Sequence, residues 1–280
     1  MNTQMSPHSS NPIARLLTIL GMVCVSAKQH NWALSLLNSA LLLDNAQVLT
    51  YIVRGNLLQD IWRYGEALAD FDFAIQLNPN RDDLLAMRGE LFFEMGNIDM
   101  AMQDLSLAIE KGCKEPNIFN MRGELHLHLG AFEPALDDFE SSISLNPQKA
   151  WPHSQKSEIC RRLGQMATAL SASDRAVDLE PNDSYMFAMR SRILEHMGRH
   201  EEAKSNIVKA LENHDTDPWD IYGHAATYVV GGDLPKALSL LAEALHRDRT
   251  LRVDLRFDPA FEALRQENEF QQLFNDLPVE

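Results

Sequence analysis

Residues 87–109 read MRGELFFEMGNIDMAMQDLSLAI, and 34 residues further on residues 121–143 read MRGELHLHLGAFEPALDDFESSI. Both stretches place small and large apolar residues at helical spacing on either side of a central glycine. Two copies of such a pattern at one fixed distance indicate a tandem repeat, in which each unit is a pair of helices.

The 34-residue period extends over seven units without insertion or deletion. Three ladders of small residues carry it: Ala33, Ala67, Ala101, Ala135, Ala169, Ala203 and Ala237; then Ala40, Ala74, Ala108, Ser142, Ala176, Ala210 and Ala244; then Gly21, Gly55, Gly89, Gly123, Ser157, Ser191 and Ala225. Small side chains allow helices to pack at the short end of the ~8–10 Å range of interaxial distances. The ladders therefore predict close helix–helix contacts within and between units.

Each unit is predicted to hold a helix A over about its first fourteen positions and a helix B over about positions eighteen to thirty-one. Glycines mark the intervening turn, at Gly96, Gly130, Gly164, Gly198 and Gly232. A glycine there permits the left-handed backbone conformation in which many helices end.

These units resemble tetratricopeptide repeats of the type common in bacteria, although the Trp often found at position four of such repeats is absent. The resemblance implies an all-α, right-handed α-solenoid or superhelix of seven tandem 34-residue helix–turn–helix repeats. The repeats are 14–47, 48–81, 82–115, 116–149, 150–183, 184–217 and 218–251. Residues 252–280 leave the register and are predicted to form a C-terminal capping helix segment, because a terminal repeat must cover its apolar face. Residues 1–13 are expected to form a flexible tail.

The composition excludes several classes of protein. A net charge of −15 over 280 residues argues against binding to nucleic acid, whose phosphates require Lys and Arg. Three cysteines, Cys24, Cys113 and Cys160, do not make a disulfide framework or a zinc motif. Residues 16–27 are apolar enough for a signal segment, which would mean export. They lie in repeat register, however, so we expect a structural helix and a cytoplasmic protein.

Position seven of helix A carries Arg where position twenty-three of helix B carries Asp. We expect three structural ion pairs rather than a ligand site: Arg54 with Asp70, Arg88 with Asp104, and Arg122 with Asp138. A guanidinium suits such a half-buried site because it can bond a carboxylate at two points.

The resemblance assigns the concave groove of the array to positions two, five, nine, twelve and thirteen of helix A. Glutamates at position nine form an acidic stripe, and aromatic residues at position two form a second stripe. The candidate groove residues are Asn56, Glu90, Asn120, Glu124, Trp151, Glu158, Tyr185, Arg192, Trp219 and Tyr222. The alternative is that the aromatic residues only pack on the preceding turn and the glutamates only solvate the surface.

We therefore expect a non-catalytic scaffold or adaptor whose groove binds a peptide or helix of a partner protein with basic and apolar side chains. The Lys positions of the known clamp for chaperone tails are not matched here. The alternatives are a client-specific chaperone or accessory protein of a secretion or envelope machine, and a structural homo-oligomer. No catalytic motif, metal-ligand spacing or cofactor loop stands out, so we expect no enzyme activity, no metal and no cofactor. Repeat five, with Ser173 in place of a large apolar residue, is expected to be a hinge or an interface.

Overall fold

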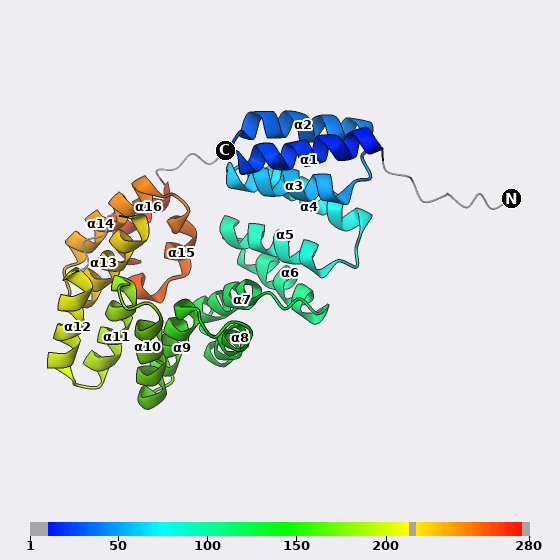
Figure 1. The fold of residues 1–280 in the computed structure, drawn as a ribbon. Coiled ribbons are helices and arrows are strands. Elements are labelled where there is room, and N and C mark those ends of the chain that lie inside the picture. Colours follow the sequence, from blue (N-terminus) through cyan, green and yellow to red (C-terminus); the bar gives the residue numbers. More distant parts are fainter. Residues whose placement is uncertain (1–10, 213–216, 276–280) are drawn as a thin grey trace. The chain divides into compact units, whose positions relative to one another are not determined.

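The computed structural model describes residues 11–212 and 217–275, and within them every regular element is helical (Figure 1). Fourteen of these helices form seven consecutive pairs, one for each predicted repeat. The pairs are α1(Pro12–Ser26) with α2(His30–Leu43), α3(Val48–Asp60) with α4(Tyr64–Leu77), α5(Asp82–Met95) with α6(Ile98–Glu110), α7(Pro116–His128) with α8(Phe132–Leu145), α9(Ala150–Arg162) with α10(Met166–Leu179), α11(Ser184–His196) with α12(His200–Glu212), and α13(Pro218–Val230) with α14(Leu234–Arg247). The predicted fold class, a solenoid of helix–turn–helix repeats, is confirmed.

The molecule consists of two compact units, each with its own core. Unit 1 covers Met1–Cys113, with α1 to α6, and unit 2 covers Lys114–Glu280, with the remaining helices. Unit 2 ends in α15(Leu251–Phe257), a 3₁₀ helix η1(Pro259–Leu264) and α16(Asn268–Asn275). The predicted tail lies in unit 1. Its residues 1–10 are outside the described part, whereas Asn11 caps a helix that already begins at Pro12.

The turn between helices A and B has the same backbone conformation in most repeats. The five predicted turn glycines have φ between 72° and 81°, in the left-handed region. In repeats one and two, this position is held by Lys28 and Trp62, with φ of 56° and 67°. Side chains disfavour this region by about 1 kcal/mol or more, so the tertiary contacts of unit 1 must hold these two turns.

The small-residue ladders lie where the two helices of a repeat come closest. All seven alanines of the first ladder are completely buried. A Cβ atom added at Gly55 would lie 2.8 Å from the ring of Phe71, and one added at Gly123 would lie 2.9 Å from the ring of Phe139. The large side chain of helix B therefore fills the space that a side chain on helix A would need.

Bidentate ion pairs join helices A and B in three repeats. Nε and Nη2 of Arg54 donate to the carboxylate of Asp70 at 2.8 and 2.6 Å, and the Arg88–Asp104 and Arg122–Asp138 pairs have the same geometry. All three carboxylates are buried. Arg88 also donates to Asp72 of the preceding repeat at 2.6 Å, so the Arg side chain binds neighbouring repeats together as well as its own two helices.

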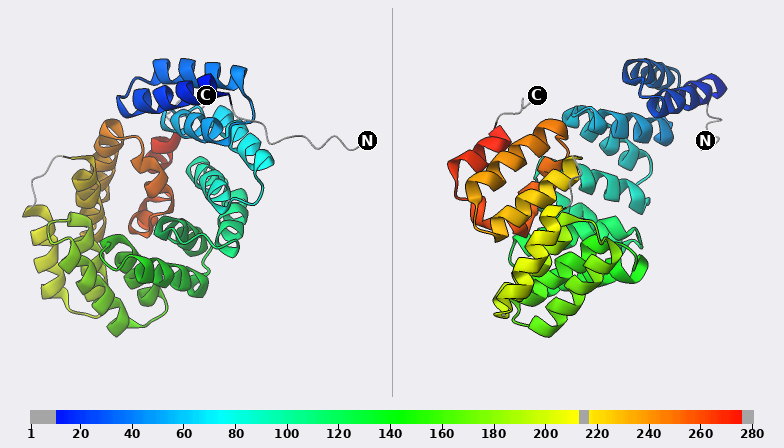
Figure 2. Two further views of the ribbon diagram at one scale, coloured as in Figure 1. Left: turned by 45° about the vertical axis from the view of Figure 1, so that its right-hand side comes forward. Right: turned by 60° about the vertical axis from the view of Figure 1, so that its left-hand side comes forward.

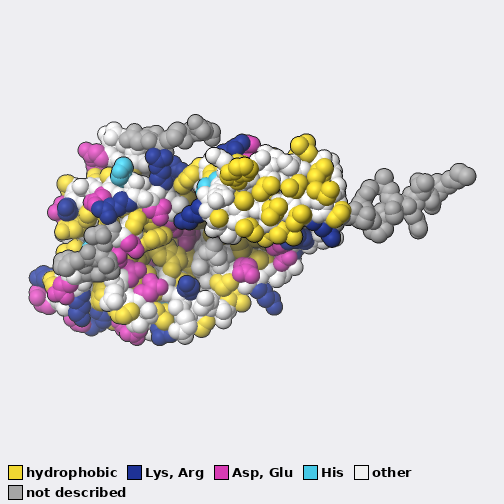
Figure 3. Space-filling model, turned by 45° about the horizontal axis from the view of Figure 1, so that its top comes forward, with side chains coloured by type: hydrophobic (Ala, Val, Ile, Leu, Met, Phe, Trp, Pro, Cys, Tyr) yellow, Lys and Arg dark blue, Asp and Glu magenta, His cyan; other side chains and the backbone are white. Residues whose placement is uncertain are grey.

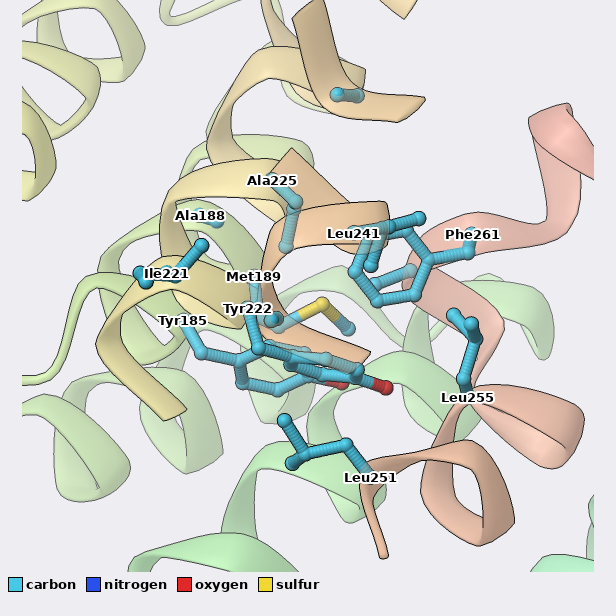
Figure 4. Packing of buried hydrophobic residues seen from close by; sticks show 14 of the residues in the cluster. Tyr185, Ala188, Met189, Ile221, Tyr222, Ala225, Leu241, Leu251, Leu255 and Phe261 are labelled. Carbon is cyan, nitrogen blue, oxygen red and sulfur yellow. The ribbon is translucent and has the colours of Figure 1, made fainter. Parts of the chain in front are cut away.

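The C-terminal segment closes the core of unit 2. Leu251, Leu255, Phe261 and Leu264 are buried in one apolar cluster with side chains of α11, α13 and α14, among them Tyr222 (Figure 4). The segment supplies six of the 20 buried residues of this cluster. The segment is therefore part of the fold of unit 2 rather than an appendage.

Repeat five has a small residue at the position of the large core side chain. Ser173 is buried, and its hydroxyl donates to the carbonyl oxygen of Leu170 at 2.9 Å. The polar group is thus satisfied within its own helix. Whether repeat five acts as a hinge or an interface stays a prediction.

Candidate functional site

In unit 2, the first helices of the repeats carry the face on which the C-terminal segment lies. We call this the inner face of unit 2: the side of α7, α9, α11 and α13 that contacts α15 and η1 (Figure 2). Trp151, Tyr185 and Tyr222, from positions two and five of three consecutive helices A, form a row here. The Trp151 and Tyr185 rings are 5.3 Å apart, the Tyr185 and Tyr222 rings 6.2 Å apart.

Asp258 is the residue of the C-terminal segment that the inner face holds most closely. The hydroxyl of Tyr185 donates to its Oδ1 at 2.8 Å, and the hydroxyl of Tyr222 donates to its Oδ2 at 2.7 Å. The backbone N–H of Ala260 donates to Oδ1 at 2.7 Å. The carboxyl group is buried, and burial raises its pKa while these donors oppose the rise. Both hydroxyls remain protonated donors, because burial raises their pKa well above 10.

Arginines and apolar rings fix the rest of the segment. Arg192 donates to the carbonyl oxygen of Pro259 at 3.1 Å, and Arg162 forms an ion pair with Glu262. The ring of Phe257 meets His128 edge-on at 5.3 Å, and Phe261 packs edge-on against Tyr222 at 4.9 Å. The segment is thus recognised through its carboxylates, its backbone and its aromatic side chains together.

Glu158 is the centre of the charges on this face. It is completely buried and accepts from Arg161 at 2.7 and 2.9 Å and from Arg162 at 2.7 Å, with Arg192 3.8 Å away. Burial acts to raise its pKa, but the three guanidinium groups outweigh it and hold the pKa below the ordinary value. Three cations around one anion leave an excess of positive charge, which Asp258 and Glu262 of the C-terminal segment balance.

Glu124 has a different environment on the same face. Trp151 Nε1 donates to its Oε1 at 3.0 Å. Burial, together with the nearby charges of Asp254 and Asp258, raises the pKa of Glu124 to about 8. This residue is therefore mostly uncharged at neutral pH, and Glu124 and Glu158 do not form an acidic stripe.

The remaining candidates of unit 2 are less enclosed. Trp219 is 48% exposed, although its ring lies 5.6 Å from that of Tyr222. Asn120 is half-buried on α7. The aromatic residues at position two thus have unequal roles: Tyr185 is a core residue that binds Asp258, whereas much of Trp219 faces water.

In unit 1, the repeat register defines the corresponding face on α1, α3 and α5. Asn56 is exposed and Glu90 is half-buried. Glu94, four residues after Glu90, accepts from Gln59 Nε2 at 2.7 Å. Burial, with a contribution from the charges of Glu90 and Asp60, raises the pKa of Glu94 to about 7. Burial also raises the pKa values of Glu90 and Asp60. This face therefore gathers three carboxyl groups that are costly to ionise together.

Sequence reasoning missed Asp258, Arg161, Arg162 and Glu94. Arg161, Arg162 and Glu94 stand at positions twelve and thirteen of helix A, which the resemblance already assigned to the groove. Asp258 precedes a proline outside the repeat register, so no periodicity marked it.

No group of three or more His, Cys, Asp or Glu among the described residues is arranged to hold a metal ion. None of the helices built from them is both long and apolar enough to cross a membrane.

A tandem array of helix pairs with a binding face on the first helices defines a helical-repeat solenoid. The family model for the tetratricopeptide repeat matches residues 185–213. This match covers one repeat, and the fold of the whole array is that of tetratricopeptide repeat structures.

Solved structures show the same fold at low sequence identity. A tetratricopeptide repeat protein from Parabacteroides merdae is 16% identical, with a TM-score of 0.69 over 87% of this chain and 99% of that one. PilW, a type IV pilus biogenesis factor, is 16% identical, with a TM-score of 0.64 over 72% and 94%. YrrB, described as having an unusual peptide-binding site, is 18% identical, with a TM-score of 0.57 over 72% and 96%. A search of curated protein sequences finds no match.

Proposed function

We propose that the chain is a non-catalytic interaction scaffold, and that the face of α1, α3 and α5 in unit 1 binds a peptide or helix of a partner protein. The observation that carries this proposal is the inner face of unit 2, which already holds a peptide segment through helix A positions two, five, nine and thirteen. Unit 1 repeats the same register. YrrB, of similar fold, has a peptide-binding site, which supports this use of the repeats.

The side chains of unit 1 favour a partner with basic and apolar residues. Glu90, Glu94 and Asp60 lie at positions nine and thirteen of their helices, and their raised pKa values mean that a neighbouring cation would stabilise the ionised forms. Leu49 at position two is 51% exposed and Met22 at position nine is 42% exposed. A Lys or Arg beside an apolar side chain matches this arrangement.

The test is a pull-down from the native cell with three baits: the wild type, a variant carrying Glu90→Gln and Glu94→Gln, and a control carrying Glu110→Gln and Glu133→Gln. The control changes the same charge at two exposed positions on helices B. We expect a partner that the wild type and the control retain and the first variant loses. Its capture should also weaken as salt is added, because the contact is ionic. A partner retained equally by all three baits would contradict this placement of the site.

A further inference from the structure

One side of α1 is apolar and exposed, although the residues that align with Val23 in later repeats are buried. We call Leu16, Ile19, Leu20 and Val23 the N-terminal face; they are 43–59% exposed. Figure 3 shows hydrophobic side chains gathered on the surface over the first helices of unit 1. A contiguous apolar surface of this kind on a folded protein marks an interaction site.

The repeat register shows what kind of structure covers this face elsewhere. Val23 stands at position ten, where the later repeats have Leu57, Leu91, Leu125, Ile159, Ile193 and Thr227, all completely buried. Leu57 packs with Ala33 and Leu37 of the preceding helix B, and Ile159 packs with Ala135 and Phe139 of its own preceding helix B. The N-terminal face is thus shaped to receive an apolar helix of the same repeat type.

The distribution of charge favours a second copy of the chain as the source of that helix. Residues 1–43 contain no Asp or Glu, although the chain has 40 acidic residues and a net charge of −15. A symmetric contact through most other surfaces would bring acidic side chains against each other. A contact between two N-terminal faces avoids this repulsion.

The opposite end of the array is not available for such a contact. In unit 2, α14 packs against α15 and α16, and its Leu241 and Leu245 are buried. Head-to-tail addition would need an open face at that end. Contact between two N-terminal faces instead covers both faces, so assembly stops at two copies.

We propose that two copies of the chain associate through their N-terminal faces, α1 against α1, to form a closed symmetric dimer. In this contact the α1 of each copy covers the N-terminal face of the other. The contact uses a different surface from the peptide site proposed above, and either could hold without the other.

The experiment is sedimentation velocity of the full chain over a wide concentration range, with light scattering for the mass. The wild type should have twice the monomer mass of 31.7 kDa. Leu16→Asp together with Val23→Asp should weaken self-association by more than about 100-fold, because the carboxylates would have to be buried at the contact.

A matched control carries Leu129→Asp and Val208→Asp. These residues are 59% and 56% exposed, against 59% for Val23 and 55% for Leu16. The control should remain a dimer, and circular dichroism should show the same helix content in all three proteins. A monomeric wild type, a dimer that persists in the α1 variant, or a mass that keeps rising beyond two copies would each overturn the proposal.

Discussion

Position nine of helix A carries a glutamate in both units, and its surroundings differ sharply between them. In unit 2, Glu158 is buried with Arg161, Arg162 and Arg192, and the C-terminal segment supplies further carboxylates to those cations. In unit 1, burial raises the pKa of Glu90, and the charges of Glu90 and Asp60 both act to raise the pKa of Glu94. The same residue type at the same position is thus ion-paired with arginines in one unit, whereas in the other burial alone shifts its pKa.

The largest expected effect comes from opening the covered face. Phe261→Ala removes a completely buried ring that packs on Tyr222, and should destabilise unit 2 by about 3–5 kcal/mol. Phe73→Ala, which removes a 51% exposed ring in unit 1, should cost less than about 1 kcal/mol. Hydrogen exchange measured by mass spectrometry reports each unit separately. If Phe261→Ala accelerated exchange equally in α13 and in α3, the division of the chain into two separately stable units would be contradicted.

The second prediction compares the changes in stability that follow substitution of Glu158 and of Glu90. Glu158→Gln leaves three arginines without their buried counter-charge and should lower the free energy of unfolding by about 2–4 kcal/mol, the arginines being partly exposed. Glu90→Gln should be neutral or slightly stabilising at pH 7, because it removes a charge that burial disfavours. Thermal unfolding of the two variants side by side measures the difference. A larger loss of unfolding free energy from Glu90→Gln than from Glu158→Gln would contradict the structural role given to Glu158.

The smallest expected effect is a dependence of the stability of the folded protein on pH. The pKa of Glu124 is about 8 in the folded protein and near 4.5 in the unfolded chain, so between these values the folded state binds more protons. Stability should therefore fall as pH rises from about 5 to 8, by roughly 1–3 kcal/mol from this group. Glu124→Gln keeps an oxygen that accepts from Trp151 and should remove this part of the slope. Glu94→Gln should flatten the profile only up to about pH 7, the pKa of Glu94. Unchanged profiles in both variants would show that neither carboxyl group titrates as described.

The repeat architecture could be predicted from the sequence because it depends on local rules. The Ala33 ladder, the turn glycines and the Arg54–Asp70 type of ion pair all follow from a fixed register, in which one repeat explains the next. The left-handed backbone conformation of Lys28 and Trp62 could not be predicted in this way. They adopt the turn conformation of a glycine because the surrounding contacts impose it.

The site was harder to predict, since it is made by a segment that does not repeat. The predicted stripe at position two included Trp219, whereas the row in the structure continues from Tyr185 to Tyr222. The position of Asp258 between Tyr185 and Tyr222 depends on contacts 73 and 36 residues apart. The predicted acidic stripe was wrong as a description of charge in unit 2, because formal charges were counted without the effect of burial on the pKa values of the glutamates. Glu124 is mostly protonated near neutral pH, and Glu158 is neutralised by its arginines.

The span of the C-terminal contacts has a consequence for biosynthesis. Arg162 pairs with Glu262 across 100 residues, whereas the ion pairs within repeats join residues 16 apart. Unit 1 can assume its final structure as soon as residue 113 leaves the ribosome. Repeats four to seven must wait, with their tyrosines and buried-charge cluster uncovered, until residues 251–264 have been translated. A stalled or truncated nascent chain would display this aromatic face, and cellular quality control would have a surface by which to distinguish it from the finished protein.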